Sequence, residues 1–240
     1  MRARTAALVL VLVGWVPGTH SAFSARESDI PVRQPARIDV PVLLVPGWLD
    51  NDRDLAALRI RLIGAGWEPE AVATVSFDDP TGSNVDHARE IAVAVDSLER
   101  ATGSDIVDIV AHSMGGLATR EYLPEGGRAR RVVFVATPHH GTWSAFLAWG
   151  DGADEMRPDS PFLVTLNAAS AVPQGVSALT VRTPLDTHIV PGEHATLDGV
   201  PDRTVCCPTH AGLLRDLEAF RVIRRFLADG VVDPDTGPAA

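Results

Sequence analysis

Residues 110–116, VAHSMGG, place Ser113 between a short apolar run and a stretch that has the pattern of a helix. The motif Ala-x-Ser-x-Gly matches the nucleophile elbow, a sharp strand-to-helix turn on which a serine hydroxyl is presented. The positions two before and two after the serine must be small because the chain packs closely there, and Ala111 and Gly115 meet this need. The motif alone is weak, since about one chain in five of this length would contain it by chance. Whether Ser113 is a nucleophile therefore depends on the secondary structure predicted on either side of the motif.

Strands and helices are predicted to alternate along the chain. Short apolar or β-branched runs indicate six strands, at residues 38–47, 71–77, 105–112, 130–138, 177–184 and 203–208. Amphipathic patterns indicate helices at residues 55–66, 83–103, 115–123 and 211–230. This alternation is typical of a parallel sheet with helices on both faces. We therefore expect an α/β fold in a single domain, with a mostly parallel sheet of about six strands and Ser113 directly after the third.

The turn after the first strand decides between two architectures of this class. Residues 45–51, VPGWLDN, contain one glycine and no G-x-G-x-x-G, which disfavours a dinucleotide-binding sheet. The chain contains no lysine, which excludes a G-x-x-x-x-G-K-[ST] phosphate loop. The α/β-hydrolase architecture remains, and because little of the chain is unassigned, we expect a minimal lid or none.

The two ends of the chain differ from the rest in composition. Residues 1–25 begin with the basic MRAR, continue with the apolar TAALVLVLVGWV, and end in small residues. This order predicts a secretory signal peptide, with an uncleaved anchor as the alternative. We expect the mature domain over residues 26–230, a disordered tail over 231–240, and a secreted, monomeric protein. The net charge of −10 disfavours a nucleic-acid partner, because a phosphate backbone attracts clusters of Lys and Arg.

A serine hydroxyl becomes a good nucleophile only when a base takes its proton, so the chain must supply a histidine and an acid. In this architecture the acid and then the histidine follow the serine in chain order. His210, in CCPTHAGLL (206–214), lies past the last strand, at the carboxyl end of the sheet where ligand sites of open parallel sheets lie. Asp186 directly follows the strand at 177–184. We therefore predict Ser113, Asp186 and His210 as the catalytic residues.

Other acids and histidines are weaker candidates for these roles. Three acids are rivals of Asp186 but stand inside a loop, where acids are usually solvated: Glu193, Asp198 and Asp202. His139 and His140 follow a strand but precede every acid candidate, so they are predicted to be supporting or surface groups. No metal or organic cofactor is expected, because these residues offer no recognisable set of metal ligands.

An oxyanion needs two backbone N–H groups aimed at the developing charge. One is predicted at Met114, the residue after the nucleophile, and the other at Trp48, in the turn after the first strand. Four residues are candidates to line a substrate pocket: Trp48, His112, Phe146 and Trp149. The apolar residues of 139–176 have the alternative role of helix core. His112 is not expected to be the base, because the elbow should hold its ring away from the serine hydroxyl.

Cys206 and Cys207 are the only cysteines, and they are adjacent. They are either free thiols packed in a strand or a strained vicinal disulfide. We expect buried thiols, while the oxidising surroundings of an exported protein favour the disulfide.

Taken together, six stretches resemble the small secreted bacterial lipases of the α/β-hydrolase fold that carry an Ala-x-Ser-x-Gly elbow. In chain order these are PVLLVPGW, IVAHSMGGLATREYL, VVFVATPHHGT, MRPDSPFLVTLN, TPLDTHIVP and PTHAGLLRD, spanning residues 41 to about 216. The chain departs from this pattern at Pro46-Gly47, where many relatives have His-Gly. It departs again at the acidic DGADEM (151–156), where some relatives have cysteine-containing loops.

The resemblance implies triacylglycerol lipase or carboxylesterase activity through an acyl-enzyme, and transient contact with a lipid interface. It also supports the roles of Ser113, Asp186 and His210, with Trp48 and Met114 as oxyanion donors. Another serine hydrolase or acyltransferase on the same fold, such as a polyester hydrolase or a transacylase, remains an alternative. A non-catalytic binding protein that kept the fold is disfavoured, because no member of the triad is missing.

Overall fold

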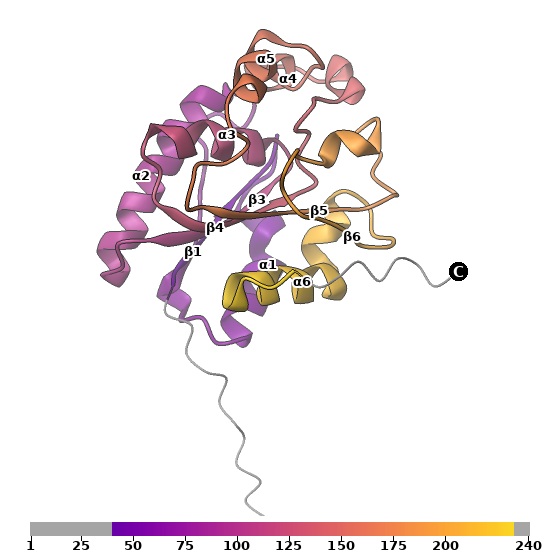
Figure 1. Cartoon of the computed structure of the whole chain (residues 1–240). Coiled ribbons are helices and arrows are strands. Elements are labelled where there is room, and N and C mark those ends of the chain that lie inside the picture. Colours follow the sequence, from indigo (N-terminus) through magenta and orange to yellow (C-terminus); the bar gives the residue numbers. More distant parts are fainter. Residues whose placement is uncertain (1–39, 233–240) are drawn as a thin grey trace, which may run out of the picture. The chain divides into compact units, whose positions relative to one another are not determined.

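A six-stranded sheet, parallel throughout, forms the centre of the described structure (Figure 1). The strands are β1 (Val42–Val45), β2 (Val72–Thr74), β3 (Val107–His112), β4 (Ala129–Val135), β5 (Ser177–Arg182) and β6 (Asp202–Thr204), in the spatial order β2-β1-β3-β4-β5-β6. The chain leaves β1 for one edge of the sheet and returns to β3 on its other side. This reversal lies between β1 and β3, and open parallel sheets place ligand sites at such a switch point.

The computed structural model describes residues 40–232 of the chain. The predicted signal peptide and most of the predicted tail lie outside these residues. Among the helices described, none is long and apolar enough to cross a membrane.

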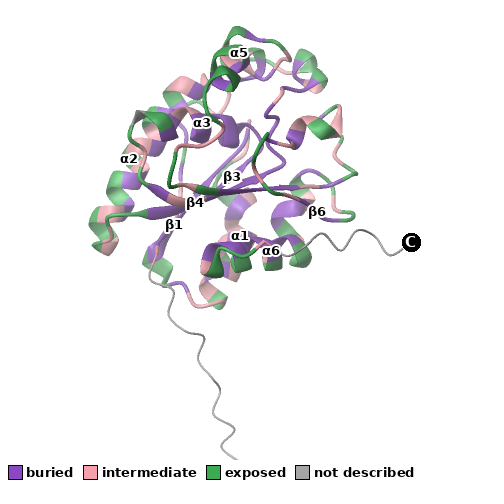
Figure 2. Cartoon of the chain, in the orientation of Figure 1, coloured by how far each residue is buried: buried purple, intermediate pink, exposed green. Residues whose placement is uncertain are grey.

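Helices cover both faces of the sheet, as the alternating pattern predicted. The α-helices are α1 (Asp52–Gly64), α2 (Asn84–Thr102), α3 (Met114–Tyr122), α4 (Asp151–Glu155), α5 (Pro161–Ala168) and α6 (Leu217–Asp229). Helices α1 and α6 pack on one face, and α2 and α3 pack on the other (Figure 1). The central strands β1 and β3 are buried throughout and β4 over most of its length (Figure 2). Parallel strands buried on both faces must be apolar nearly throughout, which is why these segments read as continuous runs rather than as alternating ones.

Helix boundaries follow from local capping. The Ser83 side chain accepts a hydrogen bond from the N–H of Val85 and begins α2, while Gly103, at φ 71°, ends it in the left-handed region. The predicted helix over 211–230 is wrong as a single element. A 3-10 turn covers Ala211–Arg215, and Asp216 then begins α6 by accepting the N–H groups of Glu218 and Ala219.

A short cap segment, residues 142–168, lies beyond the carboxyl ends of the strands (Figure 1). It contains a 3-10 turn over Trp143–Leu147, followed by α4 and α5. The Glu155 carboxylate accepts hydrogen bonds from the Ser83 hydroxyl (2.6 Å) and the Asn84 backbone N–H (2.7 Å) at the start of α2. An acid at a helix N-terminus is stabilised by the unpaired N–H groups and the helix dipole. The acidic stretch at 151–156 therefore fastens the cap to the body of the fold.

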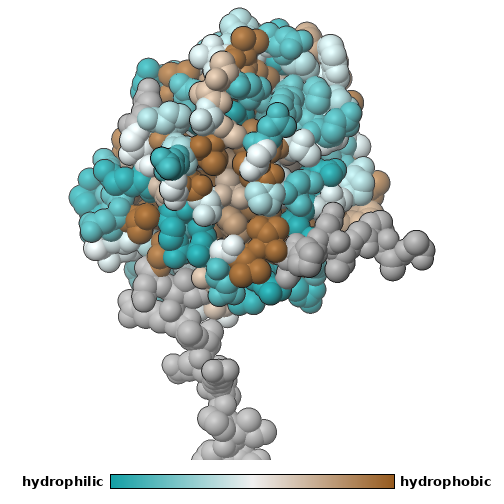
Figure 3. Space-filling model, viewed as in Figure 1, coloured by the Kyte–Doolittle hydropathy of each residue, from teal (hydrophilic) through white to brown (hydrophobic). Residues whose placement is uncertain are grey.

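Hydrophilic residues predominate on the face shown in Figure 3, with apolar clusters between them. Cys206 and Cys207 form a disulfide and are both exposed. The expectation of buried thiols was therefore wrong. Strand β6 ends at Thr204, so both cysteines lie in the loop that leads to His210 rather than in the core.

Candidate active site

Ser113 occupies a strained turn between β3 and α3. Its backbone angles, φ 52° and ψ −127°, lie in a region that non-glycine residues rarely adopt. Holding such a conformation costs on the order of 1–3 kcal/mol, which the surroundings must supply. The Ser113 N–H donates to the Val135 carbonyl (2.8 Å), so strand β4 holds the turn in place.

Close packing around the turn explains the small residues on its helical side. A Cβ added to Gly115 would overlap the carbonyl oxygen of Pro46 and lie 2.9 Å from a Val45 methyl group. A Cβ added to Gly116 would overlap the side chain of Thr137. The start of α3 can therefore approach β1 and β4 only with glycine at these two positions.

His210 and Asp186 meet at the carboxyl edge of the sheet. The Nδ1 atom of His210 lies 2.8 Å from Asp186 Oδ2. The other carboxylate oxygen of Asp186 accepts the backbone N–H groups of His188 (2.8 Å) and Ile189 (2.9 Å). These bonds orient the carboxylate, which in turn directs the Nε2 atom of His210 away from it.

The same contacts shift the protonation equilibria of the pair. Burial alone would raise the pKa of Asp186, but the hydrogen bond from His210 and those from the two N–H groups outweigh it and lower the pKa. Burial lowers the pKa of His210, and the Asp186 carboxylate offsets this only in part. At neutral pH the pair is therefore a carboxylate beside a neutral imidazole, which is the form that can accept a proton.

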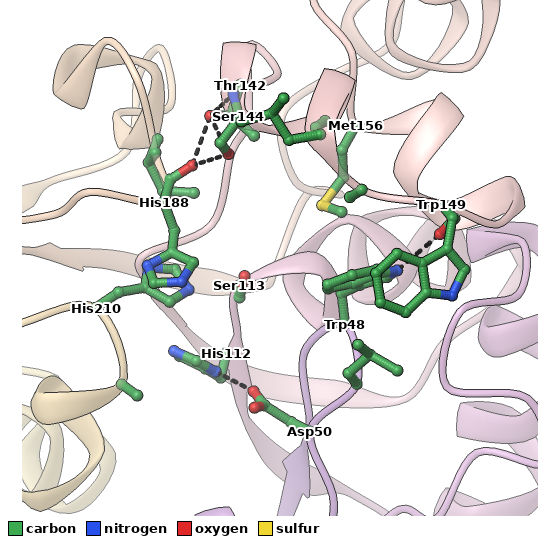
Figure 4. Close-up of a pocket in the computed structure, with 16 residues that line it drawn as sticks. Trp48, Asp50, His112, Ser113, Thr142, Ser144, Trp149, Met156, His188 and His210 are labelled. Atoms are coloured by element: carbon green, nitrogen blue, oxygen red, sulfur yellow. Dashed lines mark hydrogen bonds and ion pairs between the residues drawn. The ribbon is translucent and has the colours of Figure 1, made fainter.

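His210 contacts two further histidine rings. The His188 ring stacks on it with centroids 4.6 Å apart and planes 27° apart. The His112 ring is tilted against it, with centroids 4.7 Å apart and planes 48° apart. Both neighbours restrict the rotation of the His210 ring, and both line the same cavity as the Ser113 hydroxyl (Figure 4).

Two backbone N–H groups near Ser113 have no acceptor among the described residues. Met114 is the first residue of α3, and the first N–H groups of a helix have no acceptor within it. Among the described residues, the Trp48 N–H also has no acceptor. The turn carrying Trp48 packs closely against the elbow, since a Cβ added to Gly47 would lie 2.8 Å from the Ser113 Cβ. The indole of Trp48 is fixed by a hydrogen bond from its Nε1 to the Trp149 carbonyl oxygen (3.1 Å).

A cavity of about 430 Å³ opens in front of these groups. Its apolar lining comes from Trp48, Leu49, Ala145, Leu147, Ala148, Trp149, Met156, Ile189 and Ala211. Its polar lining comes from Asp50, His112, Ser113, Thr142, Ser144, His188 and His210. The Ser113 hydroxyl points into the space between His210 and Trp48 (Figure 4).

Three of the four predicted pocket residues, Trp48, His112 and Trp149, line this cavity, whereas Phe146 does not. The Phe146 ring instead stacks on Trp143 (5.6 Å between centroids), and the Arg157 guanidinium lies over it. The 3-10 turn gives neighbouring side chains different directions, so Leu147 faces the cavity and Phe146 does not. Leu166, also in the cap segment, packs in a core cluster with Met114 and Leu117.

Three of the weaker candidates from the sequence, His139, His194 and Asp202, lie outside the cavity. His139 is fully buried, with its ring edge-on to Phe134, and His194 binds the Gly141 carbonyl oxygen. Asp202 pairs with Arg182 at 2.8 Å. None of these three lines the cavity, so the structure brings together Asp186 and His210 and leaves the rivals apart.

Asp50, His188, Thr142 and Ser144 line the cavity but were not predicted from the sequence. Thr142 and Ser144 both donate to the His188 carbonyl oxygen and so connect the cap segment to the loop after β5. Such contacts join distant parts of the chain and leave no local sequence pattern. Asp50 lies in the turn after β1, within VPGWLDN (45–51). An acid in the turn that follows the first strand is the one sequence feature of these four residues that could have indicated a place in the site.

Asp186, His188 and His210 place potential metal-ligand atoms within 4.8 Å of one another. Asp186 Oδ2 and His210 Nδ1 already bind each other at 2.8 Å. A cation at this position would therefore compete with the carboxylate–imidazole pair.

Comparison with known proteins agrees with the architecture. No family model matches the sequence. The mature lipase BlEst2 of Bacillus licheniformis superposes with a TM-score of 0.64 at 17% identity, over 82% of this chain and 96% of that one. The chain has the α/β-hydrolase fold. Lipase B of Aspergillus fumigatus superposes with a TM-score of 0.60 at 17% identity, over 79% of this chain and 52% of that one.

A third similar structure is the phospholipase PlaB of Legionella pneumophila, in complex with thio-NAD. It has a TM-score of 0.53 and 17% identity, over 60% of this chain and 37% of that one. The chain thus spans nearly all of the Bacillus lipase, about half of the fungal lipase and little over a third of the phospholipase.

Proposed function

We propose that this protein is a secreted serine hydrolase that cleaves carboxylic esters of lipids through an acyl-enzyme. The observation that carries the proposal is that Ser113, on its strained turn, lines one cavity with Trp48 and with His210, which Asp186 binds from behind. The backbone N–H groups of Trp48 and of Met114, the residue after the serine, have no acceptor among the described residues. Each feature has other uses in proteins, but together they supply a nucleophile, a base and an oxyanion site.

The reaction would run in two halves. The Ser113 oxygen attacks the ester carbonyl carbon while His210 Nε2 accepts the hydroxyl proton. The carbonyl oxygen becomes an oxyanion and binds the Trp48 and Met114 N–H groups. As the tetrahedral intermediate collapses, His210 returns the proton to the departing alcohol. Water then attacks the acyl group in the same way, which releases the acid and restores the serine.

The apolar rim of the cavity supports a lipid substrate. Leu147 is 90% exposed and Trp149 is 62% exposed, and both line the cavity mouth. Leu49, in the turn after β1, is also exposed and apolar, as are Trp143 and Phe146 in the cap segment. Exposed apolar groups beside a pocket are typical of interaction sites. Acyl chains and the surface of a lipid aggregate would be favourable contacts for them.

Hydrolysis of a series of p-nitrophenyl esters and of emulsified triglycerides tests the activity, with Ser113→Ala as the inactive reference. Release of fatty acid from triglyceride identifies a lipase, and activity confined to short soluble esters identifies a carboxylesterase. Transfer of the acyl group to an added alcohol in preference to water would identify the alternative, an acyltransferase. A Ser113→Ala variant with full esterase activity would refute the proposed mechanism.

A matched pair of variants tests the lipid surface. Leu147→Asp places a charge on the rim, and Val93→Asp places the same charge on the exposed side of α2, where Val93 is 65% exposed. We expect Leu147→Asp alone to lower the rate on emulsified triglyceride relative to a soluble ester, by about tenfold if one buried apolar side chain is lost at the interface. Equal ratios in both variants would argue against the rim as a lipid contact.

Export rests on the sequence of residues 1–25, with basic, apolar and small residues in that order. Expression of the full chain in a bacterial host, followed by N-terminal sequencing of protein from the medium, tests it. A mature N-terminus near residues 21–25 is expected, and protein that keeps Met1 and stays with the cells would contradict export.

A further inference from the structure

A second carboxylate–imidazole pair lies beside the first. The His112 Nδ1 atom is 2.7 Å from Asp50 Oδ2, which is as close as the contact between His210 and Asp186. The His112 ring is almost completely buried, and Asp50 lies in the cavity lining. The proposed reaction uses only the His210 pair, so the second pair has no role in the steps described above.

The Asp50 carboxylate joins two parts of the oxyanion site. The Oδ2 atom that binds His112 also accepts the backbone N–H of Gly47, at 3.2 Å. Asp50 also donates its own N–H to the Gly47 carbonyl oxygen (3.2 Å), which closes the turn around Trp48. His112 is the last residue of β3 and immediately precedes Ser113. The carboxylate thus bridges the turn that carries one oxyanion donor to the strand that carries the nucleophile.

The pair also fixes how His112 can act. Hydrogen bonding to a carboxylate keeps the proton on Nδ1 and leaves Nε2 as an acceptor. Among the described residues, no group donates to the His112 Nε2 atom. The His112 ring contacts the His210 ring, with 4.7 Å between centroids. His112 therefore acts by its position, as a support for the His210 ring, rather than by moving a proton.

We propose that Asp50 and His112 are positioning residues of the ester-cleaving site. Their hydrogen bond holds the Gly47–Trp48 turn against the elbow, which keeps the Trp48 N–H aimed at the oxyanion, and it holds the His112 ring against His210. The inference rests on the proposed hydrolase function. In this proposal His112, within the elbow motif, has as its partner Asp50, which lies 62 residues earlier in the chain.

Four variants separate positioning from packing: Asp50→Ala, Asp50→Asn, His112→Ala and the double Asp50→Ala/His112→Ala. The control is Asp54→Asn, four residues along the chain in the first turn of α1, because Asp54 binds the Asn51 N–H in the cap of α1 and does not line the cavity. The kcat and KM for p-nitrophenyl butyrate and the thermal midpoint Tm are measured for each. Asn at position 50 keeps an oxygen that can accept both hydrogen bonds, whereas Ala keeps none.

Misplacement of a donor by about 1 Å costs on the order of 10²-fold, so Asp50→Ala and His112→Ala should each lower kcat by about 10–100-fold. KM should stay within about threefold, because the oxyanion bond strengthens only in the transition state. Asp50→Asn should recover most of the lost rate. The double variant should be little slower than the slower single variant, because residues that act as one unit are not additive.

Several results would overturn the inference. One is a folded Asp50→Ala variant with wild-type kcat. Another is an equal loss of kcat in Asp50→Ala and Asp50→Asn. A third is a double variant whose loss of kcat is the product of the two single losses. If His112→Ala does not fold, the comparison of Asp50→Ala with Asp50→Asn decides alone. A wild-type protein that cleaves no ester refutes the proposed function itself, whereas an active wild type with unaffected Asp50 variants refutes only the positioning role.

Discussion

Gly47→Ala adds one methyl group at the closest approach between the oxyanion turn and the elbow. The new Cβ would lie 2.8 Å from the Ser113 Cβ, 2.8 Å from Asp50 Oδ2 and 3.3 Å from His112 Nδ1. Ordinary van der Waals contact begins near 3.4 Å, so the turn and the elbow must separate by about 0.6 Å or more. The Trp48 N–H moves with the turn, while Met114 stays on α3.

This displacement sets the size of the expected effect. A misplacement of about 1 Å in a catalytic group costs on the order of 10²-fold, so we expect kcat to fall by about 10–100-fold. Overpacking costs about 1–3 kcal/mol, which should lower Tm by several degrees in a domain of this size. Hydrolysis of a soluble p-nitrophenyl ester and a thermal melt measure the two effects.

Gly64→Ala is the matched control for this change. Gly64 is the last residue of α1, and a Cβ there meets nothing within 4 Å. Alanine in a helix is favoured over glycine by about 0.5–1 kcal/mol, so this variant should be as active as wild type and no less stable. Wild-type kcat in Gly47→Ala would refute the argument that the Gly47 turn holds an oxyanion donor against Ser113.

Three further results are expected. Because burial lowers the pKa of His210 and only the neutral ring accepts a proton, kcat/KM should be constant at neutral pH and fall as the pH drops through a midpoint below about 6.5. A midpoint above that value would contradict the burial argument. Asp186→Asn removes the carboxylate that raises this pKa, so the midpoint should move lower still, and kcat should fall by about 10⁴-fold; unchanged kcat would exclude Asp186 as the acid. Reduction of the Cys206–Cys207 disulfide should lower stability by about 1 kcal/mol on the chain-entropy relation and loosen the loop that holds His210; identical Tm and kcat before and after reduction would show that the bond has no such role.

Periodicity and chain order predicted the architecture, and they predicted that Asp186 and His210 would lie at the same edge of the sheet. The strands are apolar because both faces of the sheet are covered, and this pattern appears directly in the sequence. The meeting of Asp186 and His210 followed from the position of each just past a strand, since parallel strands bring their carboxyl ends to one edge. The elbow followed from the small residues at positions 111 and 115.

Features that depend on packing between distant segments were not predictable in the same way. The bond between Asp50 and His112 joins residues 62 positions apart, and the stacking of His188 on His210 depends on how one loop folds over another. The direction of Phe146 out of the cavity depends on the 3-10 geometry of its turn. The break before α6 did carry a signal, because Asp216 is a good helix cap, but an amphipathic pattern through residues 211–230 obscured it.

The role of Ser113 as the nucleophile is tested most directly by mapping where a serine-reactive fluorophosphonate attaches. The protein is treated with the reagent, digested, and mapped by mass spectrometry, with Ser113→Ala treated in parallel. We expect one adduct per chain on Ser113 and none in the variant, because among the described serines Ser113 combines the strained turn, the neighbouring base and the two adjacent N–H groups. An adduct on another residue, or equal labelling of the Ser113→Ala variant, would contradict that role.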